Sequence, residues 1–255
     1  MSVVTSESQG ATAIIRLNRP EARNAVSQEL AEAIEAAVDD FEADDQLWTA
    51  VLTGNGPAFC AGADLKAISA GTGVRLGTKR SGFAGFVLHD RTKPVIAAVE
   101  GPAVAGGTEI VLACDLVVAG ESASFGLPEV KRSLVAAAGG TVRLPRAVPL
   151  KVAMEIALTG DHVGAPRAYE LGLVNQVCAD GTALEHALAL AERINANAPL
   201  AVRATRRAVL DGLTMDVAAG IAAAGALSGE LAGTDDFAEG PRAFVEKRAP
   251  QWKGR

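Results

Sequence analysis

The sequence predicts an α/β protein, and two patterns along its 255 residues lead to this prediction. In the first half, short β-prone runs alternate with segments whose apolar residues recur at helical spacing. Beyond residue 139 the β-prone pattern shrinks to one short run, and helical segments dominate. We therefore expect an α/β core over residues 1–198 and a helical region over residues 199–255, with Pro199 in the first turn of a new helix.

The first predicted elements are a strand and a helix. Residues 11–17 form a β-prone run that stops at Asn18-Arg19-Pro20, a turn signal. Ser27 can then cap a helix, because its hydroxyl can accept a hydrogen bond from an amide of the first turn. Apolar side chains follow on one stripe of that helix, at Leu30, Ile34, Val38 and Phe41.

The middle of the chain continues this alternation. Buried strands are predicted over residues 48–53 and 93–100, because each apolar run ends at a turn containing Gly and Pro. Residues 71–85 between them are rich in Gly, Ser and Thr, so we expect a mobile surface loop there. A helix is predicted from Gly106 to Cys114, followed by a strand over residues 116–119.

Helices dominate the remainder of the chain. The last β-prone run covers residues 173–177, and a helix is predicted over residues 182–195. The Ala-rich segment over residues 200–255 is helical in pattern, with a loop near residues 233–235. No internal repeat or long linker separates these parts.

Composition excludes several classes of partner. The 24 Lys and Arg residues against 30 Asp and Glu give a net charge of −6, which offers no overall attraction for nucleic acid or an anionic membrane. No uncharged apolar run reaches membrane-spanning length, and the first ten residues lack the apolar stretch of a secretory signal. Three cysteines without a CxxC pair support neither a disulfide framework nor a zinc site. We expect a soluble, cytoplasmic protein.

Common nucleotide, metal and hydrolase motifs do not fit this chain. Leu76 stands where a dinucleotide-binding loop needs its third Gly, and Thr78 separates Gly77 from Lys79 where a phosphate loop needs them adjacent. The three histidines lack metal-ligand spacing, and there is no Gly-x-Ser-x-Gly elbow.

Two segments instead carry backbone amides that could bind an oxyanion. A buried strand leads to Gly106-Gly107 at the start of a helix, whose first turn has free N–H groups and the positive end of the helix dipole. Small side chains in the loop over residues 57–66 leave the amides near Ala63 open. Two such donors converging on one carbonyl oxygen would form an oxyanion hole, although each segment alone is also compatible with simple packing.

Two glutamates are the candidate acid and base. Glu109 lies in the helix that begins at Gly106, beside an otherwise apolar stretch where a carboxylate is costly to bury. Glu129 follows Pro128 in a second segment. Two carboxyl groups in one pocket could act as general base and general acid, because desolvation and mutual repulsion raise at least one pKa toward neutrality.

With these segments in order, the sequence resembles the enoyl-CoA hydratase/isomerase (crotonase) superfamily over nearly its whole length. The segments that carry the resemblance cover residues 16–20, 59–65, 96–115, 125–129, 158–160, 168–174 and 239–248. The resemblance implies a spiral of ββα units with a C-terminal helical region that mediates trimers, commonly paired into hexamers. It also implies an acyl-CoA substrate and no separate cofactor, since coenzyme A is part of the substrate.

The resemblance assigns roles to the candidate residues. The amides of Ala63 and Gly106 would polarise the thioester carbonyl. Glu109 would orient and deprotonate the water that adds to the β-carbon, and Glu129 would deliver a proton to the α-carbon. The remaining family contacts with CoA fall on Arg23, Ala61, Asp64, Leu65 and Lys66, and on Phe244 and Lys247, which would reach the CoA of a neighbouring subunit.

The chain also departs from the common family pattern. Common hydratases carry Ile-Pro-Gly-Ala-Gly-Gly after the second glutamate, where this chain has Val135-Ala-Ala-Ala-Gly-Gly140. The extra methyl group of Ala137 would narrow or reshape the pocket near the attacking water. The acyl-chain preference and the efficiency of hydration therefore do not follow from the resemblance.

The sequence thus favours a hydro-lyase that hydrates trans-2-enoyl-CoA to 3-hydroxyacyl-CoA, or runs the reverse dehydration. Two alternatives stay open within the same family, carnitinyl-CoA dehydration and enoyl-CoA isomerisation. Isomerisation needs only one acid/base, so the presence of both Glu109 and Glu129 weighs against it. A third alternative is a non-catalytic acyl-CoA binding protein that keeps the fold.

Overall fold

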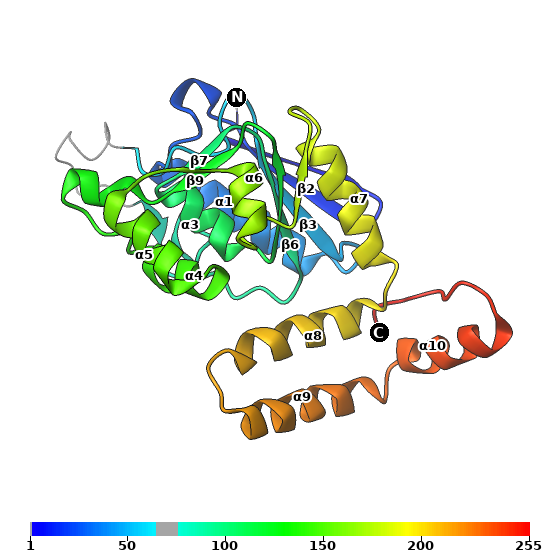
Figure 1. Ribbon diagram of the computed structural model, residues 1–255. Helices are drawn as coiled ribbons and strands as arrows, with labels where there is room; N and C mark the ends of the chain where they lie inside the picture. The colour runs from blue at the N-terminus through cyan, green and yellow to red at the C-terminus, as the bar shows by residue number, and fades with distance from the viewer. Residues whose placement is uncertain (1, 65–75) are drawn as a thin grey trace.

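The computed structural model describes residues 2–64 and 76–255, and its centre is a six-stranded sheet (Figure 1). The strand order is β1-β2-β3-β6-β8-β11, with β1 antiparallel to β2 and all other neighbours parallel. The strands are β1 (Val4–Gln9), β2 (Thr12–Leu17), β3 (Thr49–Gly54), β6 (Val95–Val99), β8 (Leu116–Gly120) and β11 (Gln176–Cys178).

The chain continues from the first sheet into a second sheet of three strands. It has the order β10-β9-β7, with strands β7 (Pro102–Val104), β9 (Ser124–Gly126) and β10 (Val163–Gly164). Strand β7 follows β6 after a turn at Gly101, where φ is +61° and a Cβ would lie 2.2 Å from the Pro57 carbonyl oxygen. Strands β6 and β7 lead into a helix, and β8 and β9 lead into another, as the predicted spiral of ββα units requires.

Nine α-helices and two short 3-10 helices surround these sheets within the described residues. They are η1 (Pro20–Ala22), α1 (Gln28–Ala43), α3 (Gly106–Ala113), η2 (Pro128–Arg132), α4 (Gly140–Ala147), α5 (Leu150–Thr159), α6 (Ala165–Glu170), α7 (Ala183–Asn195), α8 (Pro199–Gly212), α9 (Val217–Leu231) and α10 (Asp235–Glu246). Helix α1 follows its prediction closely. The Ser27 hydroxyl accepts from the Leu30 amide, and the predicted apolar stripe is buried.

The central sheet is covered on both faces, which explains why its strands read as continuous apolar runs. Helices α1 and α3 pack on one face, and α7 packs on the other (Figure 1). Helix α7 presents small, fully buried side chains to the sheet, at Ala183, Ala187 and Ala191. Alanine at these positions allows the helix backbone to approach the strands closely.

The last three helices, α8, α9 and α10, form a C-terminal arm that extends away from the sheets (Figure 1). Helix α8 starts with Pro199 in its first turn, as predicted, and Arg206 joins it to the core through Asp115 at 2.8 Å. Helix α9 has no buried residue. Among the described residues, no single helix is long and apolar enough to cross a membrane; α9 and α10 meet that criterion only as a pair bent by 83°.

Two sequence-based predictions about local structure were wrong. Residues 76–85 are not a surface loop, because β4 (Gly77–Thr78) and β5 (Gly82–Phe83) form a hairpin in which Ser81 and Ala84 are fully buried. Residues 71–75 of that expected loop lie outside the described residues. The strand expected over residues 173–177 begins only at Gln176, because Leu173 belongs to the turn that follows α6.

Candidate active site

The loop that carries Ala63 is held in place by two sets of backbone contacts. Cys60 bridges to Ala103 of β7, and the Val104 amide donates to the Cys60 carbonyl at 3.0 Å. Ala63 bridges to Val26, whose amide donates to Gly62 at 2.7 Å and whose carbonyl accepts from Asp64 at 3.0 Å. In this parallel pairing the Ala63 N–H points to the opposite side of the loop. Among the described residues it has no acceptor.

The start of α3 brings a second free amide to the same place. Ala105 precedes the helix with φ +53°, and its amide donates to the Gly126 carbonyl at 2.9 Å. The Thr108 hydroxyl lies 2.6 Å from the Ala103 carbonyl and 2.9 Å from the Gly126 amide, which ties the first turn to β7 and β9. The Gly106 N–H belongs to the first turn and has no acceptor within the helix.

These two amides lie close together because glycines allow the two segments to touch. Gly62 has φ +87°, and a Cβ there would lie 3.0 Å from the Gly106 nitrogen and 2.8 Å from the Ala105 Cβ. A Cβ on Gly106 would lie 2.3 Å from the ring of Phe83. The structure therefore places Ala63 and Gly106 in one cavity, with Phe83 packed over the second glycine.

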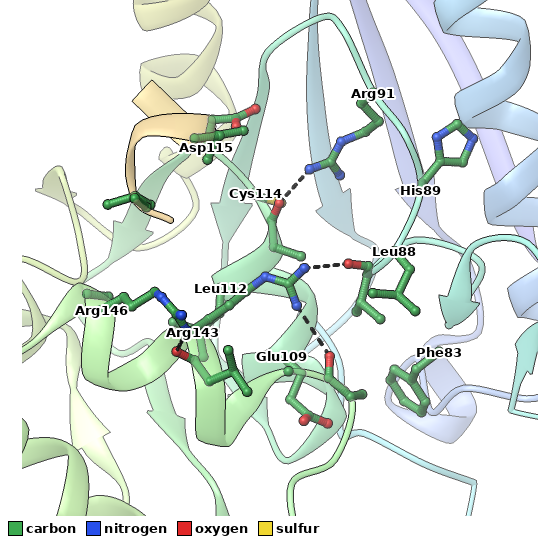
Figure 2. A pocket seen from close by; sticks show the side chains of 18 of the residues that line it. Phe83, Leu88, His89, Arg91, Glu109, Leu112, Cys114, Asp115, Arg143 and Arg146 are labelled. Carbon is green, nitrogen blue, oxygen red and sulfur yellow. Dashed lines mark hydrogen bonds between the residues drawn. The ribbon is translucent and has the colours of Figure 1, made fainter. Parts of the chain in front are cut away.

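Glu109 lies one turn into α3 and is 4% exposed. Its Oε1 accepts a hydrogen bond of 2.9 Å from the Gly140 amide at the start of α4. Burial raises the pKa of Glu109 above its ordinary value, and the charge of Glu129 raises it further, while Arg143 acts in the opposite direction. The side chain is thus a buried carboxyl group held by backbone and facing the cavity (Figure 2).

Glu129 joins the same cavity from η2, directly after Pro128. It is half-buried, and its Oε2 is buried without a hydrogen-bond partner among the described residues. Burial raises the pKa of Glu129, against a smaller effect of Arg132. Two carboxyl groups with raised pKa values in one cavity titrate as a coupled pair, in which one can hold a proton while the other is charged.

Other residues that the sequence singled out lie at the edge of this site. Arg23 is exposed with φ +51°, and its carbonyl accepts from the Ala61 amide at 3.0 Å. Ala61 lines the cavity. Asp64 forms an ion pair with Arg19 at 3.2 Å. Leu65 and Lys66 lie outside the described residues.

Phe244 and Lys247 lie at the end of the C-terminal arm, outside the lining of this cavity. Phe244 is 85% exposed, and Lys247 ends α10 with φ +54°. The structure of a single chain therefore does not bring them to Glu109 and Glu129. Their expected contact with a neighbouring subunit stays a prediction.

The sequence did not point to three groups that shape the site: the Phe83 ring, the Gly140 amide and the Arg143 side chain. Phe83 is in a Gly- and Ser-rich segment that suggested only a loop. Gly140 belongs to a Gly pair at a helix start, the same signal that identified Gly106, and could have been found in the same way. Ala137, expected to reshape the pocket, does line it.

The cavity itself is about 2450 Å³ in volume and extends well beyond the two glutamates. Its lining includes Glu109, Leu112 and Cys114 (Figure 2). It also includes Gly106 at the start of α3 and Arg206 on α8. Among the described residues, no group of three His, Cys, Asp or Glu side chains could hold a metal ion. The chemistry available here is therefore that of amide donors, two carboxyl groups and nearby arginines.

Comparison with known proteins identifies the family. The model of the family described as enoyl-CoA hydratase/isomerase matches residues 7–255. The chain belongs to the enoyl-CoA hydratase/isomerase family. A relative, enoyl-CoA hydratase EchA19 of Mycobacterium tuberculosis, is 44% identical to this chain over 254 residues, which cover 98% of this chain and 96% of that protein.

Solved structures of this family confirm the predicted crotonase fold. An enoyl-CoA hydratase from Mycobacterium tuberculosis has a TM-score of 0.96 at 45% identity, with both chains fully covered. A carnitinyl-CoA hydratase from Mycobacterium avium has a TM-score of 0.80 at 46% identity, also over the full length of both chains. High identity is thus shared with family members that bear different substrate names.

Proposed function

We propose that this protein is a crotonase-family hydratase that adds water across the 2,3 double bond of a trans-2-enoyl-CoA to give a 3-hydroxyacyl-CoA. One observation carries the proposal. Glu109 and Glu129, both with a raised pKa, line the same cavity. Ala63 and Gly106, whose amides are free, line that cavity as well. Hydration needs a base for water, an acid for carbon and a site for the negative charge between those events.

In the proposed reaction, the thioester oxygen accepts hydrogen bonds from Ala63 and Gly106 at the N-terminus of α3. The helix dipole favours the enolate charge that develops there. Glu109 takes a proton from water as its oxygen bonds to the β-carbon, and Glu129 gives a proton to the α-carbon. Glu109 ends protonated and Glu129 ionised, so one proton must pass back through solvent before the next cycle.

The proposal extends to the coenzyme. The loop that contains Ala61, Asp64, Leu65 and Lys66 would line the adenine and pantetheine channel, and Arg23 would contact a phosphate. The exposed position of Arg23 beside Ala61 supports this assignment. Since the net charge of the chain is −6, such local cations must supply the attraction for the CoA phosphates.

We also propose a homotrimer or a dimer of trimers, in which Phe244 and Lys247 of one subunit reach the CoA of its neighbour. The support is the apolar surface of the C-terminal arm, where Val217 is 80% exposed and Ile221 is 69% exposed. Helix α9 buries no residue within its own chain. Apolar surface of this extent is typical of a protein interface.

A second candidate is carnitinyl-CoA dehydration, because a carnitinyl-CoA hydratase is 46% identical to this chain. A carnitinyl group carries a quaternary ammonium. The half-buried guanidinium of Arg143 lines the cavity beyond Glu109, and a second guanidinium, that of Arg91, lies farther along it. Like charges in a cavity of low dielectric repel, so these arginines favour acyl groups without a cation.

A hydration assay on crotonyl-CoA and a panel of longer and branched enoyl-CoAs tests the proposal. The wild-type protein should consume the conjugated double bond, and Glu109→Gln and Glu129→Gln should each lose at least about 10²-fold in kcat. Carnitinyl-CoA should be a poor substrate by comparison. Tight binding of CoA esters without hydration of any of them would assign the chain to the non-catalytic alternative.

A further inference from the structure

Arg143 connects two walls of the active-site cavity. It lies on α4, and its Nη2 donates to the Val87 carbonyl at 2.6 Å, beyond the β4–β5 hairpin. Its Nη1 lies 3.5 Å from the Ala138 carbonyl, in the turn that leads to Gly140. In the view of Figure 2, the guanidinium lies between Leu88 and Glu109.

The turn over residues 138–140 is shaped around this side chain. Gly139 has φ +114°, and a Cβ there would lie 2.1 Å from Nη1 of Arg143. The next residue, Gly140, donates the amide hydrogen bond to Oε1 of Glu109. The guanidinium therefore lies directly against the turn whose amide binds the buried carboxyl group.

The charge of Arg143 has no carboxylate hydrogen-bonded to it among the described residues, since both of its contacts are to carbonyl oxygens. The side chain is half-buried. Burial lowers the pKa of Arg143, and the charge of Glu109 opposes that effect. Its positive charge is thus free to act on Glu109 through a medium of low dielectric.

The two carboxyl groups have different charged neighbours. Glu109 faces Glu129 from η2 and Arg143 from α4, and α3 itself contributes no other charge in this region. Glu129 is under the influence of Arg132, on its own short helix. Arg146 acts on Arg143 from the next turn of α4. Of the residues that the structure describes, Arg143 is the one that combines a charge acting on Glu109 with a contact to the turn that binds it.

We propose that Arg143 is a positioning residue for Glu109, the base of the proposed hydration. Its guanidinium holds the 138–140 turn, and with it the Gly140 amide, against Glu109, and its charge favours the ionised form of that carboxyl group. This inference rests on the proposed hydration, in which Glu109 accepts a proton from water.

The sign of the pH effect follows from these roles. Glu109 must be ionised to accept a proton, so kcat/KM falls on the acid side as Glu109 becomes protonated. An opposite charge nearby lowers the pKa of a carboxyl group, and removing it raises that pKa. The acid limb of the pH–rate profile should therefore move to higher pH by about 1 unit in Arg143→Gln.

Three variants test the proposal. Arg143→Gln removes the charge and the two-pronged guanidinium, and Arg143→Lys keeps the charge on a single ammonium group. Arg167→Gln on α6 is the control, because Arg167 is exposed and its ion pair among the described residues is with Glu170. Each variant is titrated by ¹³C NMR of labelled Glu carboxyls, with the Glu109 signal assigned through Glu109→Gln. Kinetics with crotonyl-CoA over the same pH range give the acid limb and the plateau.

We expect the Glu109 midpoint and the acid limb to rise together by about 1 unit in Arg143→Gln and to stay in place in Arg143→Lys. The plateau of Arg143→Lys should fall about 10-fold, because one ammonium cannot hold both carbonyls. An unchanged Glu109 midpoint in Arg143→Gln, or a midpoint in Arg143→Lys raised by about 1 unit, overturns the proposal. If Arg143→Gln does not fold, Arg143→Lys still decides through its midpoint and plateau.

The two proposals can fail separately. The carboxyl titration needs no substrate, so it tests Arg143 even if no enoyl-CoA is hydrated. Conversely, the protein could hydrate crotonyl-CoA normally while the titration midpoint of Glu109 is the same with and without Arg143. That result would keep the hydratase function and reject the positioning role.

Discussion

At the residue scale, the burial of Glu109 favours a reaction and opposes folding. Its carboxyl group is 4% exposed, and burial raises its pKa above the value that the same group has in the unfolded chain. The folded protein therefore binds the Glu109 proton more tightly than the unfolded chain does. Its contribution to stability declines as pH rises from the unfolded pKa to the folded one, and stays low above it.

We expect Glu109→Gln to raise the melting temperature at neutral and alkaline pH. Glutamine cannot ionise, and its carbonyl oxygen can still accept from the Gly140 amide. A gain of about 1 kcal/mol corresponds to roughly 2–4 °C in a chain of this size. Calorimetry at several pH values should show this gain shrinking as pH falls and Glu109 becomes protonated in the wild type.

The exposed Glu155 on α5 provides the matched control. Glu155→Gln should leave the melting temperature nearly unchanged across the same pH range. A Glu109→Gln protein that melts below the wild type at alkaline pH would show that the buried carboxylate is a net stabilising group.

At the element scale, the β4–β5 hairpin is attached to α1 through one carboxylate. Glu35 accepts hydrogen bonds from the Thr78 hydroxyl at 2.8 Å, the Ser81 hydroxyl at 2.5 Å and Arg80 Nε at 3.1 Å. Burial opposes ionisation, but these donors hold the pKa of Glu35 below its ordinary value. The hairpin ends at Phe83, which covers Gly106, so α1 reaches the proposed oxyanion site through this contact.

We expect Glu35→Gln to weaken substrate binding and lower stability together. The amide can keep one of the three hydrogen bonds, and the loss of charge-assisted bonds costs about 1–3 kcal/mol. KM for the best enoyl-CoA should rise several-fold, and the melting temperature should fall by roughly 2–12 °C. Glu32→Gln is the control, because Glu32 is exposed and its side chain, within the described part of the chain, accepts a hydrogen bond from Gln28 alone. Equal effects of both substitutions would contradict the role of the hairpin attachment.

The elements also show which parts of the structure sequence patterns can predict. Helix α1 was predictable because its N-cap and apolar stripe are local features, and β3, β6 and β8 were predictable because burial on both faces makes their strands apolar throughout. Strand β1 was not predicted, since only Val4 of its six residues is buried. Strands β7 and β9 have three residues each, too few to show a period.

In the candidate site, too, sequence patterns predict some contacts and not others. Gly106 and Glu109 share one helix, so spacing alone placed them together. The approach of Gly62 to Gly106, and of the Arg143 side chain to the Val87 carbonyl, joins segments far apart in the chain through contacts that depend on the tertiary fold. No local pattern contains that information. The roles that the family resemblance gave to Arg23, Phe244 and Lys247 remain predictions.

At the scale of the whole molecule, hydrogen bonds and an ion pair join the C-terminal arm to the core. Arg206 binds Asp115 and the Arg91 carbonyl, and the Trp252 indole donates to Ala196 at 2.8 Å. Asp236 accepts hydrogen bonds from the amides of Lys253 and Gly254, which brings the last residues of the chain back to the first turn of α10. The arm is thus closed on itself while its apolar surface is left exposed.

We expect light scattering to give three or six times the 26.0 kDa mass of one chain. Ile221→Asp should shift this distribution toward single chains and lower activity with it, because a carboxylate would then be buried in the interface. Tyr169→Ser, an exposed position on α6, should leave the mass unchanged. A wild-type protein that is a single chain at micromolar concentration would contradict the trimer and the contact of Phe244 with a neighbour.

The alanine face of α7 has a practical consequence for altering substrate range. Ala183, Ala187 and Ala191 have no accessible surface, and they fill the far side of the sheet from the cavity. Larger side chains there would push apart the strands that carry both halves of the site, with no gain in pocket volume. Libraries aimed at new acyl groups should therefore vary Val135 and Ala137 at the rim of the cavity and leave the α7 face as it is.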